Sequence, residues 1–299
     1  MKRILVLPRI SIQNANALSS PYTIGFPAMT AWLGVMHALQ RKLKEKNNDL
    51  DDLTFDSIAV VNHEFNLHTY KGSGDFNYSI IATSNPLKKD GKRPATIEEA
   101  RCHLTVSLVI EYSDIDYDEA LEMLEDVTPL LHHMKIASGD VLDFQQPCLK
   151  TITNQQETKQ LMAKLMPGFC LIERRELVEK AMEHGLDGMD AVLDALTINS
   201  HCYVIDKTEG AEQIKWMQSR KQSGWVVPIA IGFQGITNLA KFTNQRDAVT
   251  PHRFAESVVT LGEFIMPARI ENLDNMLWHY ANVENNLYLC QQNQPLINS

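Results

Sequence analysis

The sequence predicts an α+β fold, and three observations carry this prediction. Residues 3–11 and 102–112 are branched or alternating apolar runs, which are typical of strands. Residues 28–46 and 116–133 carry apolar side chains at spacings of three and four, which are typical of helices that bury one face. Up to residue 144 the order is strand, helix, strand, strand or hairpin, strand, helix, strand. That order resembles a ferredoxin-like or RRM-type unit with an insertion.

Each element of the first half has its own signal in the sequence. The expected elements are a strand at 3–11, a polar loop at 14–20, a helix at 28–46, strands at 57–67 and 76–82, a basic loop at 85–95, a strand at 102–112, a helix at 116–133, and a strand at 134–144 interrupted at Ser138-Gly139. The first helix ends in basic residues, which suit the negative end of its dipole. The basic loop holds two prolines and one glycine, which favour turns.

The second half is less regular and reads as a C-terminal α/β extension. The expected elements are a helix at 158–166, a strand at 168–172, helices at 173–183 and 189–196, a polar linker or surface loop at 207–223, a strand at 224–235, a helix from 250 to 264 that starts at Pro251, and a frayed tail after Gln291. We therefore expect an RRM-like core at residues 1–145, with a basic loop insertion around 66–100. An α+β portion at 146–299 is expected to pack on that core.

The charge of the chain is unevenly distributed. With 28 Lys and Arg against 37 Asp and Glu, the net charge is -9, which excludes a non-specific nucleic-acid binder. Residues 1–46, however, hold seven basic residues and one acidic residue, while residues 111–126 hold eight acidic residues and no basic one. A specific RNA contact near the N-terminus is therefore compatible with the total. The acidic helix is expected to face solvent or a basic partner.

Cysteines, apolar runs and motifs exclude several classes of protein. The five cysteines form no CxxC pair, and their odd number fits a reducing compartment. No apolar stretch approaches the roughly 18 residues that a membrane span needs. We therefore expect a cytoplasmic protein without membrane contact. The glycine-rich phosphate loops, the HExxH zinc motif and the GxSxG elbow are absent, so no cofactor and no metal are expected.

The amide-rich segment 11–20 is the first candidate for RNA binding. Gln13, Asn14 and Asn16 follow Arg9 at the end of a strand and precede the basic helix that holds Arg41. Amides present donors and acceptors together, which suits the edges of unpaired bases. Their alternative role is to satisfy the backbone of a loop.

The second candidate is the loop that carries Lys88, Lys89 and Arg93, in which Gly91 allows a turn. A protruding loop of this charge can follow a phosphate backbone, although a charge run is more often a solvated face. His37 is a third candidate, either as the general base of a metal-independent ribonuclease or as a packed or RNA-contacting residue. Trp225, Trp278 and Phe233 can stack bases or face a partner, and core packing is favoured for them.

A long motif links the chain to a known family. LPRISIQNANALSSPYTIGFPAMTAWLGVMHALQRK at residues 7–42 closely resembles the Csy-two subunit of type I-F CRISPR surveillance complexes, a Cas-five-class member of the RAMP superfamily. The likeness continues, in the family's order, through NPLKKDG, EEARCHLTVSLVIE, PGFCLIERREL, GWVVPIAIGF, TPHRFAESVVTLGEFIMPARI and LWHY. It is weakest at residues 197–223.

The resemblance implies an RRM-like RAMP fold and a non-catalytic role in gripping the 5′ handle of CRISPR RNA. It implies a heterodimer with the large subunit, which forms the tail of the complex beside the first backbone subunit. Target DNA lies near that tail, but no motif assigns a residue to it. The resemblance also implies that another subunit of the complex cleaves the repeat, which disfavours catalysis by His37. A RAMP-type endoribonuclease that processes repeat RNA stays the alternative. Where family members often have Gly-Gly, this chain has Ser138-Gly139, which argues against close approach of RNA there.

Overall fold

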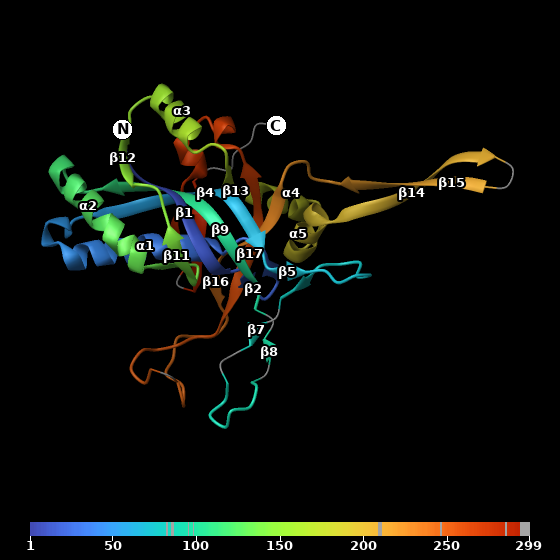
Figure 1. The fold of residues 1–299 in the computed structure, drawn as a ribbon, viewed down its shortest axis with the longest axis horizontal. Helices are drawn as coiled ribbons and strands as arrows, with labels where there is room; N and C mark the ends of the chain where they lie inside the picture. The colour runs from blue at the N-terminus through green and yellow to red at the C-terminus, as the bar shows by residue number, and fades with distance from the viewer. Residues whose placement is uncertain are drawn as a thin grey trace.

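The computed structural model describes residues 1–81, 83–84, 87–94, 96–97, 99–208, 211–245, 247–284 and 286–293. Its centre is one large antiparallel sheet (Figure 1). The strands follow the order β10-β11-β1-β9-β4-β13-β17-β16-β19-β18, and β12 also pairs with β1. Their bounds are β1 Lys2–Asn16, β4 Thr54–Leu67, β9 Arg101–Ser113, β10 Lys135–Ile136, β11 Gly139–Asp143, β12 Cys148–Ile152, β13 Phe169–Glu173, β16 Val226–Gly235, β17 Ala255–Ile265, β18 Trp278–Glu284 and β19 Leu287–Gln292.

The sheet turns back on itself in its second half. β18 pairs with β4 between Trp278 and Ile58, so β4, β13, β17, β16, β19 and β18 form a closed ring of neighbours. Closing a sheet removes exposed edges, which otherwise present unpaired backbone groups. Strands from both halves of the chain therefore share one hydrogen-bonded structure.

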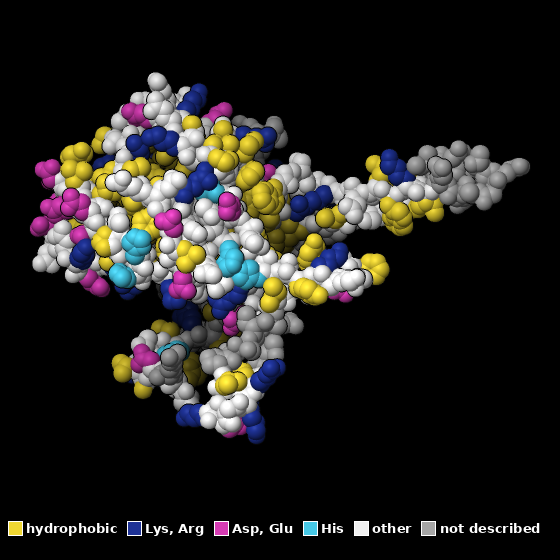
Figure 2. Space-filling view, viewed as in Figure 1, with side chains coloured by type: hydrophobic (Ala, Val, Ile, Leu, Met, Phe, Trp, Pro, Cys, Tyr) yellow, Lys and Arg dark blue, Asp and Glu magenta, His cyan; other side chains and the backbone are white. Residues whose placement is uncertain are grey.

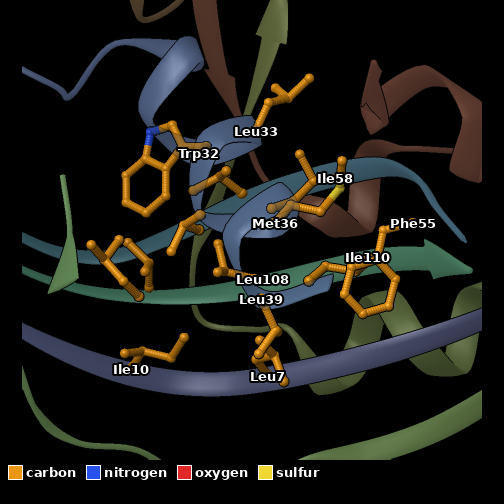
Figure 3. Close-up of a cluster of buried hydrophobic side chains, with 14 of the residues drawn as sticks. Leu7, Ile10, Trp32, Leu33, Met36, Leu39, Phe55, Ile58, Leu108 and Ile110 are labelled. Atoms are coloured by element: carbon orange, nitrogen blue, oxygen red, sulfur yellow. The ribbon is translucent and has the colours of Figure 1, made fainter. Parts of the chain in front are cut away.

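Five α-helices lie within the described residues, and they cover the two faces of the sheet. Their bounds are α1 Met29–Lys46, α2 Tyr117–His133, α3 Gln155–Lys164, α4 Arg175–Glu183 and α5 Gly188–Leu196, and the 3-10 turns are η1 Asn48–Leu50, η2 Pro267–Arg269 and η3 Leu273–Met276. α1 and α2 bury their apolar faces on one side, in a cluster that includes Trp32, Leu39 and Leu7, with Leu39 beside Leu7 (Figure 3). α3 packs on the other side, against Ile4 and Val6. Alternation along β1 thus supplies both cores.

Four short ladders stand apart from the sheet. They are β2 Leu18–Ser20 with β3 Thr23–Ile24, β5 Thr69–Tyr70 with β6 Ser79–Ile80, β7 Thr83–Ser84 with β8 Thr96–Ile97, and β14 Ile198–Thr208 with β15 Ala211–Arg220. The last three extend as hairpins away from the body (Figure 1). The predicted basic insertion between β4 and β9 is formed by two of them. Asn85, Pro86 and Ala95 of the predicted loop lie outside the described residues.

Three predictions from the sequence were wrong. Residues 14–20 are not a loop, because β1 continues to Asn16 and β2 follows at Leu18–Ser20. Residues 207–208 and 211–220 are not a linker or a surface loop, because they belong to β14 and β15, which pair along their length. Residues 250–264 are not helical: β17 occupies Ala255–Ile265 and is hydrogen-bonded on both sides, to β13 and to β16. The β-branched residues Val258, Val259 and Thr260 favour a strand where two partners are available.

The remaining differences are smaller. The predicted strand at 76–82 is reduced to Ser79–Ile80 in β6, and Ala82 lies outside the described residues. Of the predicted frayed tail after Gln291, Gln292 still belongs to β19, and residues 294–299 lie outside the described residues. Among the described residues, none of the helices combines the length and the apolar character that crossing a membrane requires.

Candidate nucleic-acid interface

The second half of β1 carries two residues with left-handed backbone conformations. Arg9 has φ +52° and Asn14 has φ +57°, and the register of β1 against β9 shifts beside each of them. Asparagine tolerates this conformation better than most residues, whereas arginine seldom adopts it. The two irregularities change which side chains face outward, and they leave Gln13 and Asn14 exposed.

Gln13 lines an open groove of about 330 Å³ on the sheet. The other polar residues that line it are Ser11, Glu64, Asn66, His103 and Thr105. Ile12, Leu104 and Val106 point into the core beneath α1 and α2, so alternation places His103 and Thr105 on the opposite face. α3 covers only part of that face. We call this feature the polar groove.

The polar groove offers donors and acceptors and is not strongly basic. Glu64 repels phosphate but can accept a hydrogen bond from a base amino group. The His103 ring lies 4.2 Å from the ring of His68, centroid to centroid. Burial, and after it the neighbouring His103, lower the pKa of His68. Chemically the polar groove suits the recognition of base edges better than the neutralisation of phosphates.

The three predicted amides differ in their own hydrogen bonds. Asn16 is occupied by its own chain, since its Nδ2 donates to the Leu18 carbonyl (3.0 Å) and its Oδ1 accepts from the Leu18 amide (3.1 Å). The backbone of Asn14 is fixed by its N–H, which donates to His103 Nδ1 at 3.2 Å. The side chains of Gln13 and Asn14 have no hydrogen-bond partner within the described part of the chain. Two of the three amides are therefore available to a ligand.

Arg9 does not reach into the polar groove. Its guanidinium donates to the carbonyls of Met166 (3.1 Å) and Pro167 (3.4 Å), and its backbone N–H donates to Ser107 Oγ (3.0 Å). The Ser107 hydroxyl donates in turn to His63 Nε2 (2.7 Å), whose Nδ1 donates to the Pro167 carbonyl (2.6 Å). Arg9 thus ties β1 to the start of β13.

The same contacts predict a dependence of stability on pH. Burial lowers the pKa of His63, the Pro167 carbonyl opposes this, and the charge of Arg9 adds to it. The folded chain therefore binds fewer protons than the unfolded chain below about pH 6.5, so stability is lost as the pH falls through that value. Urea unfolding of the wild type and of His63→Gln, at about pH 7.5 and about pH 5.5, measures this contribution. The wild type should lose more stability on acidification.

The pKa values of His68 and His279 are lowered as well. Both residues are present in the wild type and in the variant, so their contributions to stability cancel in the comparison. Equal losses in the two proteins would show that His63 is not buried as a neutral ring.

Much of the N-terminal positive charge is used inside the chain. Lys2 forms ion pairs with Glu111 (2.5 Å) and Asp274 (2.8 Å). Lys46 forms an ion pair with Asp126 of the acidic helix α2 (2.5 Å). Lys44 donates a hydrogen bond to the Asp51 carbonyl (2.6 Å). Arg3 donates to the Ile115 carbonyl and lies 5.3 Å from the centre of the Tyr112 ring. The acidic helix therefore meets the basic helix of the same chain.

His37 and Arg41 lie apart from the polar groove. Both are exposed on α1, which covers the opposite face of the sheet. The His37 ring faces the edge of Tyr280 on β18, 6.4 Å away. The structure therefore does not bring these two residues together with Gln13 and Asn14.

Lys88, Lys89 and Arg93 form a separate basic tip. All three are exposed in the turn that follows β7, where Gly91 has φ +77° and its N–H donates to the Lys88 carbonyl. Figure 2 shows Lys and Arg side chains gathered at the end of this projection. The described residues contain no cluster of three or more potential metal ligands. The polar groove and the basic tip are thus two distinct surfaces.

The groove residues on β4 and β9 were missed from the sequence. His103 and Thr105 alternate with the buried Leu104 and Val106, which was the available signal. What the sequence did not contain was the register that places them beside Gln13.

Most of the chain matches a known family. The family model described as CRISPR-associated protein (Cas_Csy2) matches residues 5–290. This chain belongs to the Csy2 family. One relative, CRISPR-associated protein Csy2 of Pseudomonas aeruginosa (strain UCBPP-PA14), is 34% identical over 311 aligned positions, which cover 95% of this chain and 94% of the relative. The match includes most of β1, the polar groove and the basic tip, so these surfaces lie within the part shared with the Csy2 family.

Proposed function

We propose that this Csy2-family chain binds the 5′ handle of CRISPR RNA without cleaving it, as a subunit of a type I-F CRISPR surveillance complex. The observation that carries the proposal is a pair of free, exposed amides: Gln13 lines the polar groove, and Asn14 lies beside it, where its backbone N–H donates to His103. The 5′ handle is single-stranded in this proposal, and proteins read single-stranded RNA by contacts to base edges. Family membership supports the CRISPR context.

We assign the first part of the chain to a ferredoxin-like RAMP fold. β1, α1, β4, β9, α2 and β11 follow one another as βαββαβ, with the sheet order β11-β1-β9-β4 and antiparallel pairing throughout. This order supports a core at residues 1–145. Residues 146–299 then form the portion that packs on it and closes the ring of strands.

The two surfaces have different roles in this proposal. The basic tip neutralises phosphates, which positions the RNA without reading its sequence. Gln13 and Asn14 bond to base edges or 2′-hydroxyls, which gives preference for one handle. Arg9 holds the strand that presents them. The exposed acidic side chains of α2 and the edge strands of the large sheet are then available to the large subunit and the neighbouring backbone subunit.

Replacing Gln13 and Asn14 together by alanine should weaken handle binding about ten-fold, because each neutral hydrogen bond contributes about 0.5–1.5 kcal/mol. Filter binding or fluorescence anisotropy with the repeat-derived handle measures the effect. The matched control replaces Gln155 and Gln156, two exposed amides at the start of α3, and should leave the affinity unchanged. Equal affinities for both double variants would contradict the assignment of the polar groove.

The alternative is an endoribonuclease in which His37 acts as the general base. His37 is exposed, as that role requires, and its ring neighbour is Tyr280. Incubating the full chain with repeat RNA separates the two functions. Specific cleavage that is lost in His37→Ala would favour the nuclease, and tight binding without cleavage would favour the handle-binding subunit.

A further inference from the structure

A second pocket lies on the face of the sheet opposite the polar groove. Glu64 and Asn66 line the polar groove, whereas Phe65, between them on β4, points to the other face. The centroid of the Phe65 ring lies 6.3 Å from the centroid of the Phe26 ring. Phe65, Phe26, Trp225 and Phe264 surround a cavity of about 140 Å³, together with Ile24 and Asn62. We call this feature the aromatic pocket.

The aromatic side chains of the pocket differ in how much of each is exposed to solvent. Phe26 and Phe264 are 8% exposed and lie 5.2 Å apart in an edge-to-face contact at its floor. The Trp225 and Phe264 ring centroids lie 4.9 Å apart. Trp225 is 47% exposed, and Phe65 is 37% exposed. Large aromatic side chains left open beside a cavity can provide faces for stacking a flat ring.

Asn62 supplies a polar group at this apolar site. It is 4% exposed, and its Oδ1 has no hydrogen-bond partner among the residues that the structure describes. A buried polar atom without a partner destabilises the folded protein, so such atoms are rare unless a ligand satisfies them. An amide carries a donor and an acceptor side by side, whichever way it is oriented. The site therefore suits a flat ring with a complementary donor and acceptor on its edge.

We infer that the aromatic pocket binds one unpaired pyrimidine base of the RNA. The base ring lies against Trp225 and Phe65, and its pairing edge bonds to the Asn62 amide. Cytosine and uracil both present a donor beside an acceptor on that edge. An apolar cavity of about 150 Å³ in another protein holds a single benzene ring, so about 140 Å³ favours a one-ring base over a purine. The inference rests on the proposed function and adds a base-selective site to it.

The first test separates stability from binding in one substitution. Asn62→Leu keeps the side-chain size and removes the unpartnered polar atom, so the melting temperature of the RNA-free protein should stay the same or rise. Its affinity for the handle should fall by about five- to ten-fold. Handle affinity is measured on the full chain in complex with the subunits that co-purify with it. Trp225→Leu provides a second variant, with an expected loss of about five-fold or more from stacking. Trp216→Leu, at an exposed tryptophan of β15 that lies outside the pocket, is its matched control.

The second test identifies the base. Handle RNAs are prepared with one abasic nucleotide at each pyrimidine position in turn. One position should weaken binding to the wild type by more than it weakens binding to Asn62→Leu, because the variant has already lost the hydrogen bonds of that base and keeps only its stacking. An unmodified cytosine-to-uracil exchange at that position then shows which base is preferred.

Three outcomes would overturn the inference. If the wild type binds the handle and no abasic position is coupled to Asn62, the aromatic pocket does not take a base, while the proposed function stands. If Asn62→Leu and Trp225→Leu weaken subunit assembly but leave RNA affinity unchanged, a protein side chain occupies the pocket. If the wild type does not bind the handle at all, the proposed function fails first.

Discussion

Trp278→Ala is expected to lower the free energy of unfolding by about 3–5 kcal/mol. Trp278 is completely buried, and it lies where β18 meets β4 and closes the ring of strands. Its indole N–H donates to the Leu171 carbonyl on β13 at 2.9 Å. Truncation therefore leaves a large cavity and removes a hydrogen bond to a buried carbonyl at the same point. Equilibrium unfolding in urea, followed by circular dichroism, measures the loss.

Two control variants separate the contributions to this loss. Trp278→Phe keeps most of the volume and removes the hydrogen bond, so it should lose about 1–3 kcal/mol. Phe233→Ala, at a side chain that is 45% exposed, should have a smaller effect than Trp278→Ala. If Trp278→Ala were no more destabilising than Phe233→Ala, Trp278 would not anchor the closure of the ring.

Gly139→Ala is expected to destabilise the fold by about 1–3 kcal/mol and to weaken handle binding. A Cβ atom at Gly139 would lie 2.7 Å from the carbonyl oxygen of Gln13, 2.7 Å from Ile12 Cγ2 and 2.9 Å from Ala15 Cα. Two of these three atoms belong to the backbone of β1, so β11 and β1 must separate to admit the methyl group. Because Gln13 lies in that segment, the polar groove is displaced as well.

The neighbouring residue provides a control of opposite sign. Ala137 and Ser138 have φ +48° and +66° and form the two-residue turn between β10 and β11. Ser138→Gly relieves a left-handed serine and should raise stability by at most about 1 kcal/mol. Urea unfolding of both variants compares the two signs, and anisotropy with the handle reports the change at Gln13. A neutral Gly139→Ala would mean that β11 packs less closely on β1.

The same geometry explains which glycine of this turn matters. A serine can adopt the conformation at Ser138, whereas no side chain fits at Gly139, because β1 of the same chain fills the space beside it. The departure from Gly-Gly falls at the position where the backbone tolerates it.

Local patterns in the sequence determined the elements that carry their own signal. The alternation of Leu104, Val106, Leu108 and Ile110 predicted β9, and the helical spacing of Trp32, Leu33, Met36 and Leu39 predicted α1. The motif that begins at Leu7 placed the chain in its family, which the comparisons confirmed. These features need only neighbouring residues, so they can be read along the chain.

Only the tertiary structure decided β17, the polar groove and the aromatic pocket. Residues 254, 258, 261 and 264 have helical spacing, but pairing with β13 and β16 outweighs that local preference. The basic charge of the N-terminal segment was visible in the sequence, and its neutralisation by Glu111, Asp126 and Asp274 was not. Each of these depends on contacts between residues far apart in the chain. Their free energies are comparable to local preferences, so sequence-local signals cannot determine the result.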